Sequence, residues 1–511
     1  MLQYADDTLI LIRATTEDVI NLKTTLDSFS AATGLKINYH KSTVVPMHVT
    51  ESQLRRLLKV LQCQRADFPQ VYLSLPLSNV KLNLAVFAPL IAKVDKQLAG
   101  WKATLLNHAG RLVLLNAMLD GMPAHLMSAL LLPAGTVDAL DKRRRAFLWS
   151  GQDKVHGSQC LIAWDKVCIS KQDGGLGVKP ISVQNACLML KLLHRLHHPT
   201  GSFWATWARR HVDVHTLEGD VQGAHWDAIR SLLPAYHQIT RIAVHDGVAT
   251  AFWEDCWSGD APLCSYFPVL YSHVLNHGAT LHDVASAGLE SFLALRLSSQ
   301  ARSELASVQL ILDAWTPTAS IDKHCSPLES TDHRLISGKI YKLATSLDGT
   351  CAFYKFVWQN HAPPKVKFFA WLLLQGRIQC KSNLKMKNIV DSNVCELCNH
   401  SPETADHLVS GCPFAQRFWR HIGWEPSLIP PVADLWKVQA QAGAPSRTLH
   451  TMTLLCCWEL WLHRHEVVFR HRAPDLRRLL TSCRDTAELW SCRLPASQRS
   501  DIEHWRYLFV M

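Results

Sequence analysis

Three cysteines and one histidine, Cys395, Cys398, His407 and Cys412, lie close together in the last quarter of the chain. Three thiolates and one imidazole are a suitable ligand set for a tetrahedral Zn²⁺ ion. We expect the first two cysteines on a tight turn, with His407 and Cys412 closing the site from the following turn or helix. His400 follows Cys398 too closely for easy chelation. Ordinary buried thiols and an ordinary histidine are the alternative, and the pattern favours one bound Zn²⁺.

Two adjacent carboxylates, Asp6 and Asp7, follow Tyr4 near the start of the chain. The segments 2–5 and 8–12 read as two short strands, which puts the carboxylates at the turn of a hairpin. Mg²⁺ is commonly held by one or two carboxylates plus substrate phosphates, so this arrangement would suit metal-assisted nucleotidyl transfer. The alternative is an ordinary turn, because Asp favours turns in any case.

Positive charge is concentrated in one segment of the chain. The sequence has 53 Lys and Arg against 43 Asp and Glu, a net charge of +10. Between Lys339 and Val390 there are nine Lys and Arg and one acid, Asp348, so this segment carries +8 of the total. Such an excess suggests RNA or DNA as a partner, and a solvated helix face is the alternative. The candidate binding residues are Lys365, Lys367, Arg377, Lys381, Lys385 and Lys387.

The elements that would position the acidic turn can be read from the first 45 residues. Thr15 with Asp18 three residues later resembles a capping box, and apolar residues then recur at helical spacing. Gly34 is a plausible residue for the end of this helix. A further short strand over 36–39 would follow. The sequence therefore predicts an α+β fragment here.

The middle of the chain reads as helical, with two local features of interest. From 83 to 149 the apolar pattern is that of several helices interrupted by Pro123 and Pro133. The basic cluster 142–145 is either a phosphate-facing patch or, more commonly, a wet helix face. The segment 174–177, Gly-Gly-Leu-Gly, marks a turn and lacks the Lys-Ser/Thr of a phosphate loop.

Length and composition exclude several classes of protein. A chain of 511 residues suggests about three domains, and 48% hydrophobic with 19% charged residues is ordinary for a globular protein. Its longest apolar stretches are far too short to span a bilayer, and Asp6 and Asp7 stand where a signal peptide would be apolar. Sixteen scattered cysteines suggest reduced thiols. We expect an intracellular protein, nuclear or cytoplasmic, that is neither secreted nor bound to a membrane.

Several short motifs together resemble the reverse transcriptases of non-LTR (LINE-type) retrotransposons, especially those of plants. Each motif alone is weak, but their combination and order are specific, and they extend to about residue 420. The first group comprises Leu2–Ile10, Gly34–Asn38, Lys41-Ser42, Tyr72–Leu77, Trp101-Lys102, Ala109–Arg111, Arg145–Gly151, Ala163-Trp164 and Gly174–Gly177. The second group, from Phe353 through Pro363–Val366, Phe369–Trp371, Cys395–Cys398, Glu403, His407 and Cys412 to Trp419, is similar to the zinc-binding domain that follows these enzymes.

The resemblance implies a particular architecture for the whole chain. We expect an α+β fold with a palm remnant made of a short β-hairpin plus a helix, followed by a largely helical thumb and connector. A small zinc-binding module and a helical C-terminus would complete it. The expected division is 1–80 for the palm remnant, 81–200 for the thumb-like region, 201–335 for the connector, 336–425 for the zinc-binding domain and 426–511 for the tail.

The resemblance also bears on activity. In that family, residues matching Asp6 and Asp7 bind catalytic Mg²⁺ together with a third palm carboxylate carried on an earlier strand. This sequence begins three residues before Tyr4 and leaves no room for that strand. We therefore expect no polymerase activity from this chain alone, and Mg²⁺ only if the palm is completed by a longer reading frame. The alternatives are half of an RNA-directed DNA polymerase or an inert retroelement remnant. The C-terminal segment shows no ribonuclease H-like set of spaced carboxylates.

Overall fold

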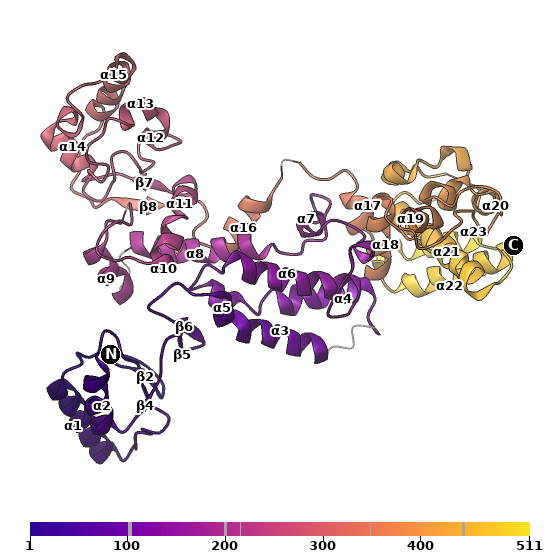
Figure 1. The fold of residues 1–511 in the computed structure, drawn as a ribbon. Coiled ribbons are helices and arrows are strands. Elements are labelled where there is room, and N and C mark those ends of the chain that lie inside the picture. The colour runs from indigo at the N-terminus through magenta and orange to yellow at the C-terminus, as the bar shows by residue number, and fades with distance from the viewer. Residues whose placement is uncertain (101–104, 199–201, 215, 348, 442–444, 511) are drawn as a thin grey trace. The chain divides into compact units, whose positions relative to one another are not determined.

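The computed structural model describes residues 1–100, 105–198, 202–214, 216–347, 349–441 and 445–510 (Figure 1). Trp101, Lys102 and Asp348, singled out from the sequence, lie outside these residues. The chain divides into two compact units, each built from separated segments. Unit 1 comprises Met1–Pro89, Ala124–Thr136 and Asn185–Ile340, and unit 2 comprises Leu90–Pro123, Val137–Gln184 and Tyr341–Met511. The five-part division expected from the sequence stays a prediction.

The fold is mostly helical, with small pairs of strands. In the described residues every sheet has two strands, and three of the four pairs are antiparallel. The pairs are β1 (Leu2–Tyr4) with β2 (Asp7–Leu9), β3 (Thr43–Val44) with β4 (Gln64–Arg65) in parallel, β5 (Gln70–Tyr72) with β6 (Leu75–Leu77), and β7 (Arg241–Ala243) with β8 (Lys323–Cys325). The predicted mixture of helices with few strands is confirmed. No helix among these residues is both long and apolar enough to cross a bilayer.

Unit 1 contains the hairpin and most of the middle of the chain. Its helices are α1 (Thr16–Thr33), α2 (Glu51–Leu61), α5 (Ala124–Met127), α9 (Phe203–His211), α10 (Ala224–Arg230), α11 (Leu233–Ile239), α12 (Leu263–Tyr266), α13 (Pro268–Tyr271), α14 (Leu281–Ala287) and α15 (Ser299–Asp313). Two further helices are shared with unit 2: α8 (Ile181–His197) belongs to unit 1 from residue 185 onward, and α16 (Ser337–Thr345) belongs to unit 1 up to residue 340. The segment 244–315 has a core of its own, in which Trp253 is fully buried.

The first predicted helix is confirmed, together with both of its ends. The Thr15 hydroxyl accepts a hydrogen bond from the Asp18 N–H at 3.1 Å, and Gly34 ends α1 in the left-handed conformation. The Asp18 carboxylate does not complete a capping box but pairs with Arg13 at 2.9 Å. α1 and α2 pack around a small core that includes Val19.

The strand expected over 36–39 is wrong. Asn38 starts a turn instead: its side-chain oxygen accepts a hydrogen bond from the Lys41 N–H, and its carbonyl oxygen accepts from Lys41 and Ser42. Asn side chains compete for backbone N–H groups in this way, which removes them from a β ladder. The next strand, β3, begins only at Thr43.

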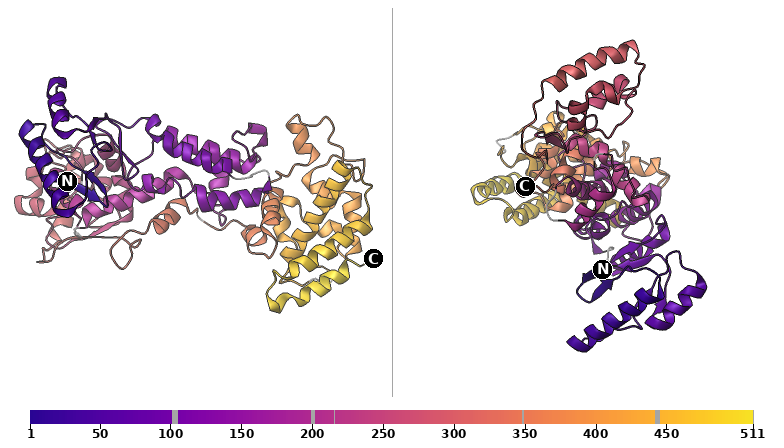
Figure 2. Two further views of the ribbon diagram at one scale, coloured as in Figure 1. Left: turned by 90° about the horizontal axis from the view of Figure 1, so that it is seen from below. Right: turned by 90° about the vertical axis from the view of Figure 1, so that its left-hand side faces the viewer.

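Unit 2 contains the Cys/His cluster and the C-terminal helices. Its helices are α4 (His108–Leu114), α7 (Trp164–Cys168), α17 (Tyr354–Trp358), α18 (Pro364–Leu374), α19 (Lys381–Met386), α20 (Pro413–His421), α21 (Leu449–Arg470), α22 (Leu476–Ser491) and α23 (Ser500–Leu508). It also contains the π-helical turns η3 (Leu115–Leu119) and η6 (His407–Gly411). Most of α3 (Ala88–Gly100), from residue 90 onward, and of α6 (Ala134–Trp149), from residue 137 onward, belongs to this unit as well. In the views of Figure 2, α21 and α22 lie against the elements of the Cys/His region, and α18 contacts α21 while α20 contacts α22.

α18 is a core helix, as its apolar composition suggests. Every residue from Phe368 to Leu374 is buried. The indole N–H of Trp371 donates a 2.7 Å hydrogen bond to the carbonyl oxygen of Gly174, which ties this helix to the predicted glycine turn. A side chain at Gly175 would place its Cβ 2.1 Å from the Ile169 carbonyl oxygen, so only glycine fits there. The glycine motif is therefore a structural turn.

The basic cluster 142–145 is neither a phosphate-facing patch nor a fully solvated helix face. Arg144 is buried and makes ion pairs of 2.6 Å with Asp120 and with Asp141. Arg143 pairs with Asp95 at 2.5 Å. Only Lys142 is fully exposed. The arginines of this cluster hold α6 to its neighbours instead of facing solvent or phosphate.

Candidate metal centre

The first half of the Cys/His cluster lies on a tight loop. A β-bridge between Val394 and Pro402 closes the loop, and the Cys395 N–H donates to the Ser401 carbonyl oxygen at 2.9 Å. Asn399 adopts a left-handed conformation, and its N–H donates to the Cys395 carbonyl oxygen at 2.7 Å. The turn predicted for the first cysteine pair is confirmed, and it directs Cys395 and Cys398 to the same side.

The second half of the cluster is brought together by the π-helical turn η6. The Cys412 N–H donates to the His407 carbonyl oxygen at 2.6 Å, so residues five apart in sequence become neighbours. π-Helical turns are rare and are frequent at functional sites. α20 begins immediately afterwards with Pro413 in its first turn, which leaves Cys412 at the helix N-terminus.

The four predicted ligands converge. Ligand atoms of Cys395, Cys398, His407 and Cys412 all lie within 4.8 Å of one another. The Cys398 sulfur lies 3.4 Å from Nε2 of His407. Cys395 and Cys412 are buried, and the other two are half-buried. Tetrahedral zinc sites with bonds of about 2.0–2.3 Å need donors at such spacing after a small contraction, so the residues fit the ion.

The donors perturb one another electrostatically. The hydrogen bond between the thiols of Cys395 and Cys412, together with burial, raises the pKa of Cys395 to about 12. The same hydrogen bond lowers the pKa of Cys412, and backbone N–H groups of Phe414 and Ala415 at the start of α20 add to this effect. A hydrogen bond with Cys395 raises the pKa of His407. A thiolate is thus favoured at Cys412, and a cation is required before all three sulfurs can be charged.

A buried ion pair between Glu403 and Arg464 joins the cysteine loop to α21. The Glu403 carboxylate receives hydrogen bonds of 3.1 Å and 2.6 Å from the Arg464 guanidinium of α21, and both side chains are at most 1% exposed. The backbone N–H of Lys381 also donates to Glu403 at 2.8 Å. Outer groups of this kind orient the ligands of a metal site. Sequence reasoning missed Arg464, because it stands among polar residues at 463–466 that give no sign of burial.

The acidic turn has a different outcome. Asp7 is the first residue of β2 and pairs with Tyr4, so the turn consists of Ala5 and Asp6. Both carboxylates are exposed, and the Tyr4 side chain is 66% exposed. Among the described residues, the groups that could hold a metal ion do not include Asp6 or Asp7. Their role as Mg²⁺ ligands stays a prediction.

Two of the candidate nucleic-acid-binding residues have partners within the protein. The Lys367 ammonium donates to the Trp358 carbonyl oxygen at 2.9 Å, and burial lowers its pKa. Lys381 forms a 2.5 Å ion pair with Glu396 of the cysteine loop. These contacts tie both side chains to unit 2.

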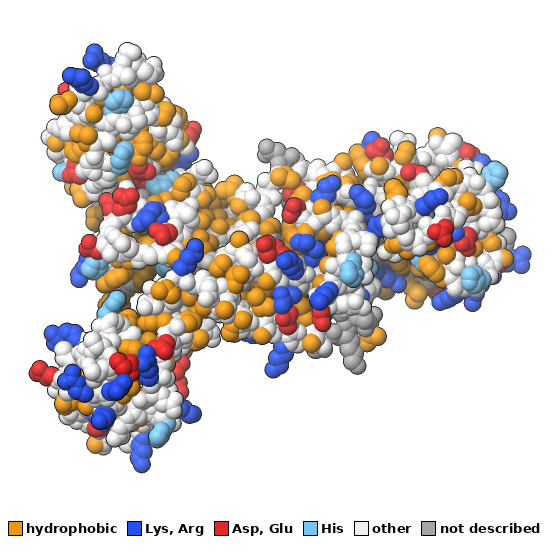
Figure 3. Space-filling model, in the orientation of Figure 1, with side chains coloured by type: hydrophobic (Ala, Val, Ile, Leu, Met, Phe, Trp, Pro, Cys, Tyr) orange, Lys and Arg blue, Asp and Glu red, His pale blue; other side chains and the backbone are white. Residues whose placement is uncertain are grey.

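The other four candidates are more accessible. Lys365, Arg377 and Lys385 are exposed, and Lys387 is half-buried with a 2.7 Å hydrogen bond to the Ser158 carbonyl oxygen. Arg377 and Lys387 line a hollow of about 230 Å³ beside α19, and burial and the nearby Arg377 charge lower the pKa of Lys387. On the face shown in Figure 3, basic side chains over α17–α23 are scattered rather than gathered in one patch.

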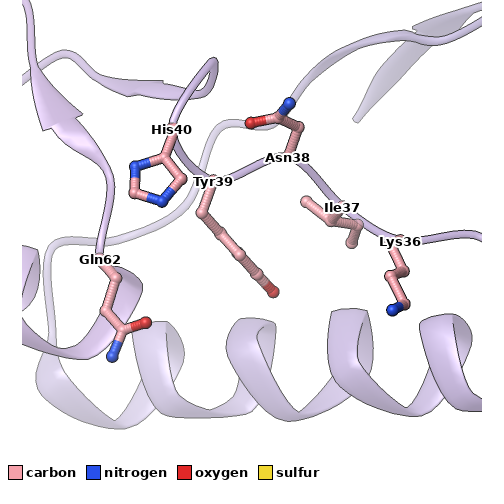
Figure 4. Close-up of a pocket in the computed structure, with 6 residues that line it drawn as sticks. All are labelled: Lys36, Ile37, Asn38, Tyr39, His40 and Gln62. Atoms are coloured by element: carbon pink, nitrogen blue, oxygen red, sulfur yellow. The ribbon is translucent and has the colours of Figure 1, made fainter.

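A second hollow lies in unit 1, beside the turn at Asn38. Its volume is about 390 Å³, and its lining comprises Lys36, Ile37, Asn38, Tyr39, His40 and Gln62. Figure 4 shows Tyr39 pointing toward a helix and Asn38 pointing away from it. The Lys23 ammonium of α1 lies 3.5 Å from the centre of the Tyr39 ring, and the Tyr39 hydroxyl donates to Asp27 at 3.0 Å. These contacts hold Tyr39 and the turn at Asn38 against α1.

Comparisons with known proteins agree with this geometry. Residues 336–419 match the family described as zinc-binding in reverse transcriptase. The chain is 26% identical over 372 residues to the "Putative ribonuclease H protein" of Arabidopsis thaliana, an alignment that covers 68% of this chain and 57% of the relative. It is also 27% identical over 145 residues to an "Uncharacterized mitochondrial protein" of the same plant, covering 27% of this chain and 94% of the relative. The chain thus spans little more than half of the first relative.

The matched residues contain the whole Cys/His cluster and the buried Glu403. The expected resemblance to plant retroelement proteins with a reverse-transcriptase zinc-binding domain is confirmed: residues 336–419 match that domain, and the chain is similar to two plant proteins.

Proposed function

We propose that this chain binds RNA or DNA as the zinc-binding, C-terminal part of a non-LTR (LINE-type) retrotransposon reverse transcriptase. The observation that carries the proposal is the attachment of a basic segment to the Cys/His site. Lys381 at the start of α19 contacts both Glu403 and Glu396 of the cysteine loop. A metal ion that orders this loop therefore also orders α19.

Zinc has a structural role in this proposal. A site with four protein ligands keeps no open position for a substrate and contributes folding energy outright. Two of the ligands come from a loop, and the other two come from η6 and from its junction with α20. The ion holds these elements together, and the nucleic acid is contacted elsewhere.

The contact surface that we propose is formed by Arg377, Lys385 and Lys387 at α19. Arg377 and Lys385 are exposed, and the structure gives them no ion pair among the described residues. Asn383 and Gln379 line the same hollow as Arg377 and Lys387 and offer further hydrogen-bonding groups. Aromatic stacking contributes little, because Phe368, Phe369 and Trp371 belong to the core. Recognition is therefore mainly of the phosphate backbone.

Binding of single-stranded RNA and DNA to the full chain tests this proposal. Neutralising Arg377, Lys385 and Lys387 together to Gln is expected to weaken binding and to lower the slope of log affinity against log salt by about 2, because each lost single-strand phosphate contact removes about 0.7. Fluorescence anisotropy of labelled oligonucleotides between low and moderate salt measures both quantities.

The matched control neutralises three exposed lysines of unit 2, Lys93, Lys96 and Lys142, to Gln. It removes the same charge and is expected to leave the salt slope nearly unchanged. Equal losses in the two variants would reduce the interaction to general attraction by net charge. Binding by the wild-type chain that does not respond to salt would contradict the proposal.

We also propose that the chain has no polymerase activity by itself. In support, Asp6 and Asp7 lie exposed on a two-stranded sheet, without a third carboxylate, His or Cys grouped with them among the described residues. Two catalytic metal ions need more ligands than this pair offers. Primer extension on poly(A)–oligo(dT) with Mg²⁺ is expected to give no product. Extension that Asp6→Ala abolishes would favour the alternative, a functional half of an RNA-directed DNA polymerase.

A further inference from the structure

A second group of side chains that can ligate a metal lies in unit 1, where the sequence analysis predicts no metal site. His194 and His198 are one helical turn apart at the end of α8, with the His198 N–H bonded to the His194 carbonyl oxygen at 3.2 Å. Glu329 faces them from the loop after β8. One ligand atom from each of the three residues lies within 4.8 Å of the others.

The polar atoms of this group are buried and incompletely satisfied. The side chain of His194 is 3% exposed and that of Glu329 is 8% exposed, and Nε2 of His194 lies 3.7 Å from Oε1 of Glu329. Oε1 of Glu329 and Nε2 of His198 are both buried without a hydrogen-bond partner. Burying such atoms unpaired costs about 1–3 kcal/mol each, so two of them side by side indicate a missing ligand.

The imidazoles are oriented as metal ligands usually are. Nδ1 of His194 lies 3.0 Å from the Tyr236 hydroxyl, and His198 hydrogen-bonds to the backbone of His324. A second partner on the ring nitrogen that does not ligate commonly fixes a histidine at a metal site. Nε2 of His194 also lies 3.2 Å from the His333 carbonyl oxygen, a contact that a metal would replace.

A fourth donor is within reach. Nδ1 of His333 lies 3.3 Å from the other carboxylate oxygen of Glu329, and its ring is stacked with that of His198. The His333 side chain is 68% exposed and can move. Two or three imidazoles with one carboxylate form a nitrogen–oxygen set that suits Zn²⁺ at bond lengths of about 2.0–2.2 Å.

We propose that His194, His198 and Glu329 form a second Zn²⁺ site, with His333 or water in the fourth position. The ion joins the end of α8 to the loop at 329–333, two segments more than 130 residues apart in sequence. This site has no sulfur ligand, so its chemistry differs from that of the Cys/His site.

The metal content of the full chain tests the second site. After removal of metal with a chelator, reloading with Zn²⁺ and gel filtration, the wild-type chain is expected to retain two ions by mass spectrometry. The double variant His198→Gln with Glu329→Gln is expected to retain one, and so is the double variant Cys398→Ser with Cys412→Ser. His282→Gln removes an exposed histidine of the same unit and is expected to retain two.

Co²⁺ spectra distinguish the two sites even where a variant folds poorly. In the wild-type chain one equivalent is expected to give intense thiolate charge-transfer absorption, and the other only weak d–d bands. A wild-type chain that retains only one ion, and still retains it after the His198/Glu329 change, would overturn the second site and leave the Cys/His site intact. If the wild-type chain retains one ion that is kept in the cysteine double variant but lost in the His198/Glu329 double variant, the second site is supported and zinc at the cysteines is contradicted.

Discussion

Replacing Cys412 by serine will remove the zinc ion from the Cys/His site and destabilise unit 2 more than any other single substitution considered. Cys412 supplies the thiolate that α20 stabilises, and it closes the π-helical turn that carries His407. Structural zinc contributes about 10–16 kcal/mol in small zinc-finger peptides, so losing it should lower the unfolding free energy by several kcal/mol even in a larger unit. Zinc analysis and thermal melting of the full chain measure the effect.

The control for this prediction is Cys492→Ser, which changes an exposed cysteine in the same unit. It is expected to leave both the melting temperature and the thiolate charge-transfer band of the Co²⁺ form unchanged. A Cys412→Ser chain that keeps the full charge-transfer band and melts like wild type would show that the four residues are ordinary core side chains. Treatment of the wild-type chain with a strong chelator should reproduce the destabilisation without any substitution.

Removing the charge of Glu403 will be the second most damaging change. Glu403→Gln leaves the Arg464 guanidinium buried without a counter-charge, and breaking a buried pair from one side typically costs about 3–5 kcal/mol. The cysteine loop also loses its anchor, so zinc affinity should fall by about 10–100-fold, as for other outer-shell partners. Urea unfolding and competition with a zinc-binding dye measure the two effects.

A double substitution that removes both charges identifies the cause. Changing Glu403 to Leu and Arg464 to Met together removes both charges, and it is expected to recover much of the stability lost in Glu403→Gln. Asp434→Asn breaks an exposed ion pair with Lys437 and should change stability by less than about 1 kcal/mol. If Glu403→Gln proves no worse than Asp434→Asn, the pair does not hold the loop.

The candidate site could be predicted well because its information is local. Two residues separate Cys395 from Cys398 and four separate His407 from Cys412, so the spacing and the residue types together predict a zinc site and its first turn. The start and end of α1 were also readable, because a cap at Thr15 and a left-handed Gly34 act over a single helical turn.

The failures concern partners that are distant in sequence. The basic cluster was read as a surface because nothing in residues 142–145 reveals that Asp120 lies opposite Arg144. Glu403 and Arg464 are 61 residues apart, and His194 meets Glu329 only after the whole intervening segment has folded. At Lys36–Tyr39 the error is local: a short strand is expected there, and the side chain of Asn38 instead accepts a hydrogen bond from the Lys41 N–H.

The pairing of Glu403 with Arg464 of α21 means that the zinc-binding domain packs against a helix outside the segment that matches the family. The match to the zinc-binding family ends at residue 419, yet Phe369 packs against Trp458 and Trp461 of α21, and Phe414 stacks on His463 of the same helix. A clone trimmed to the homologous boundaries would expose these rings to solvent and strand the Glu403 carboxylate. We therefore expect a chain that carries this domain in folded form to carry the following helices as well.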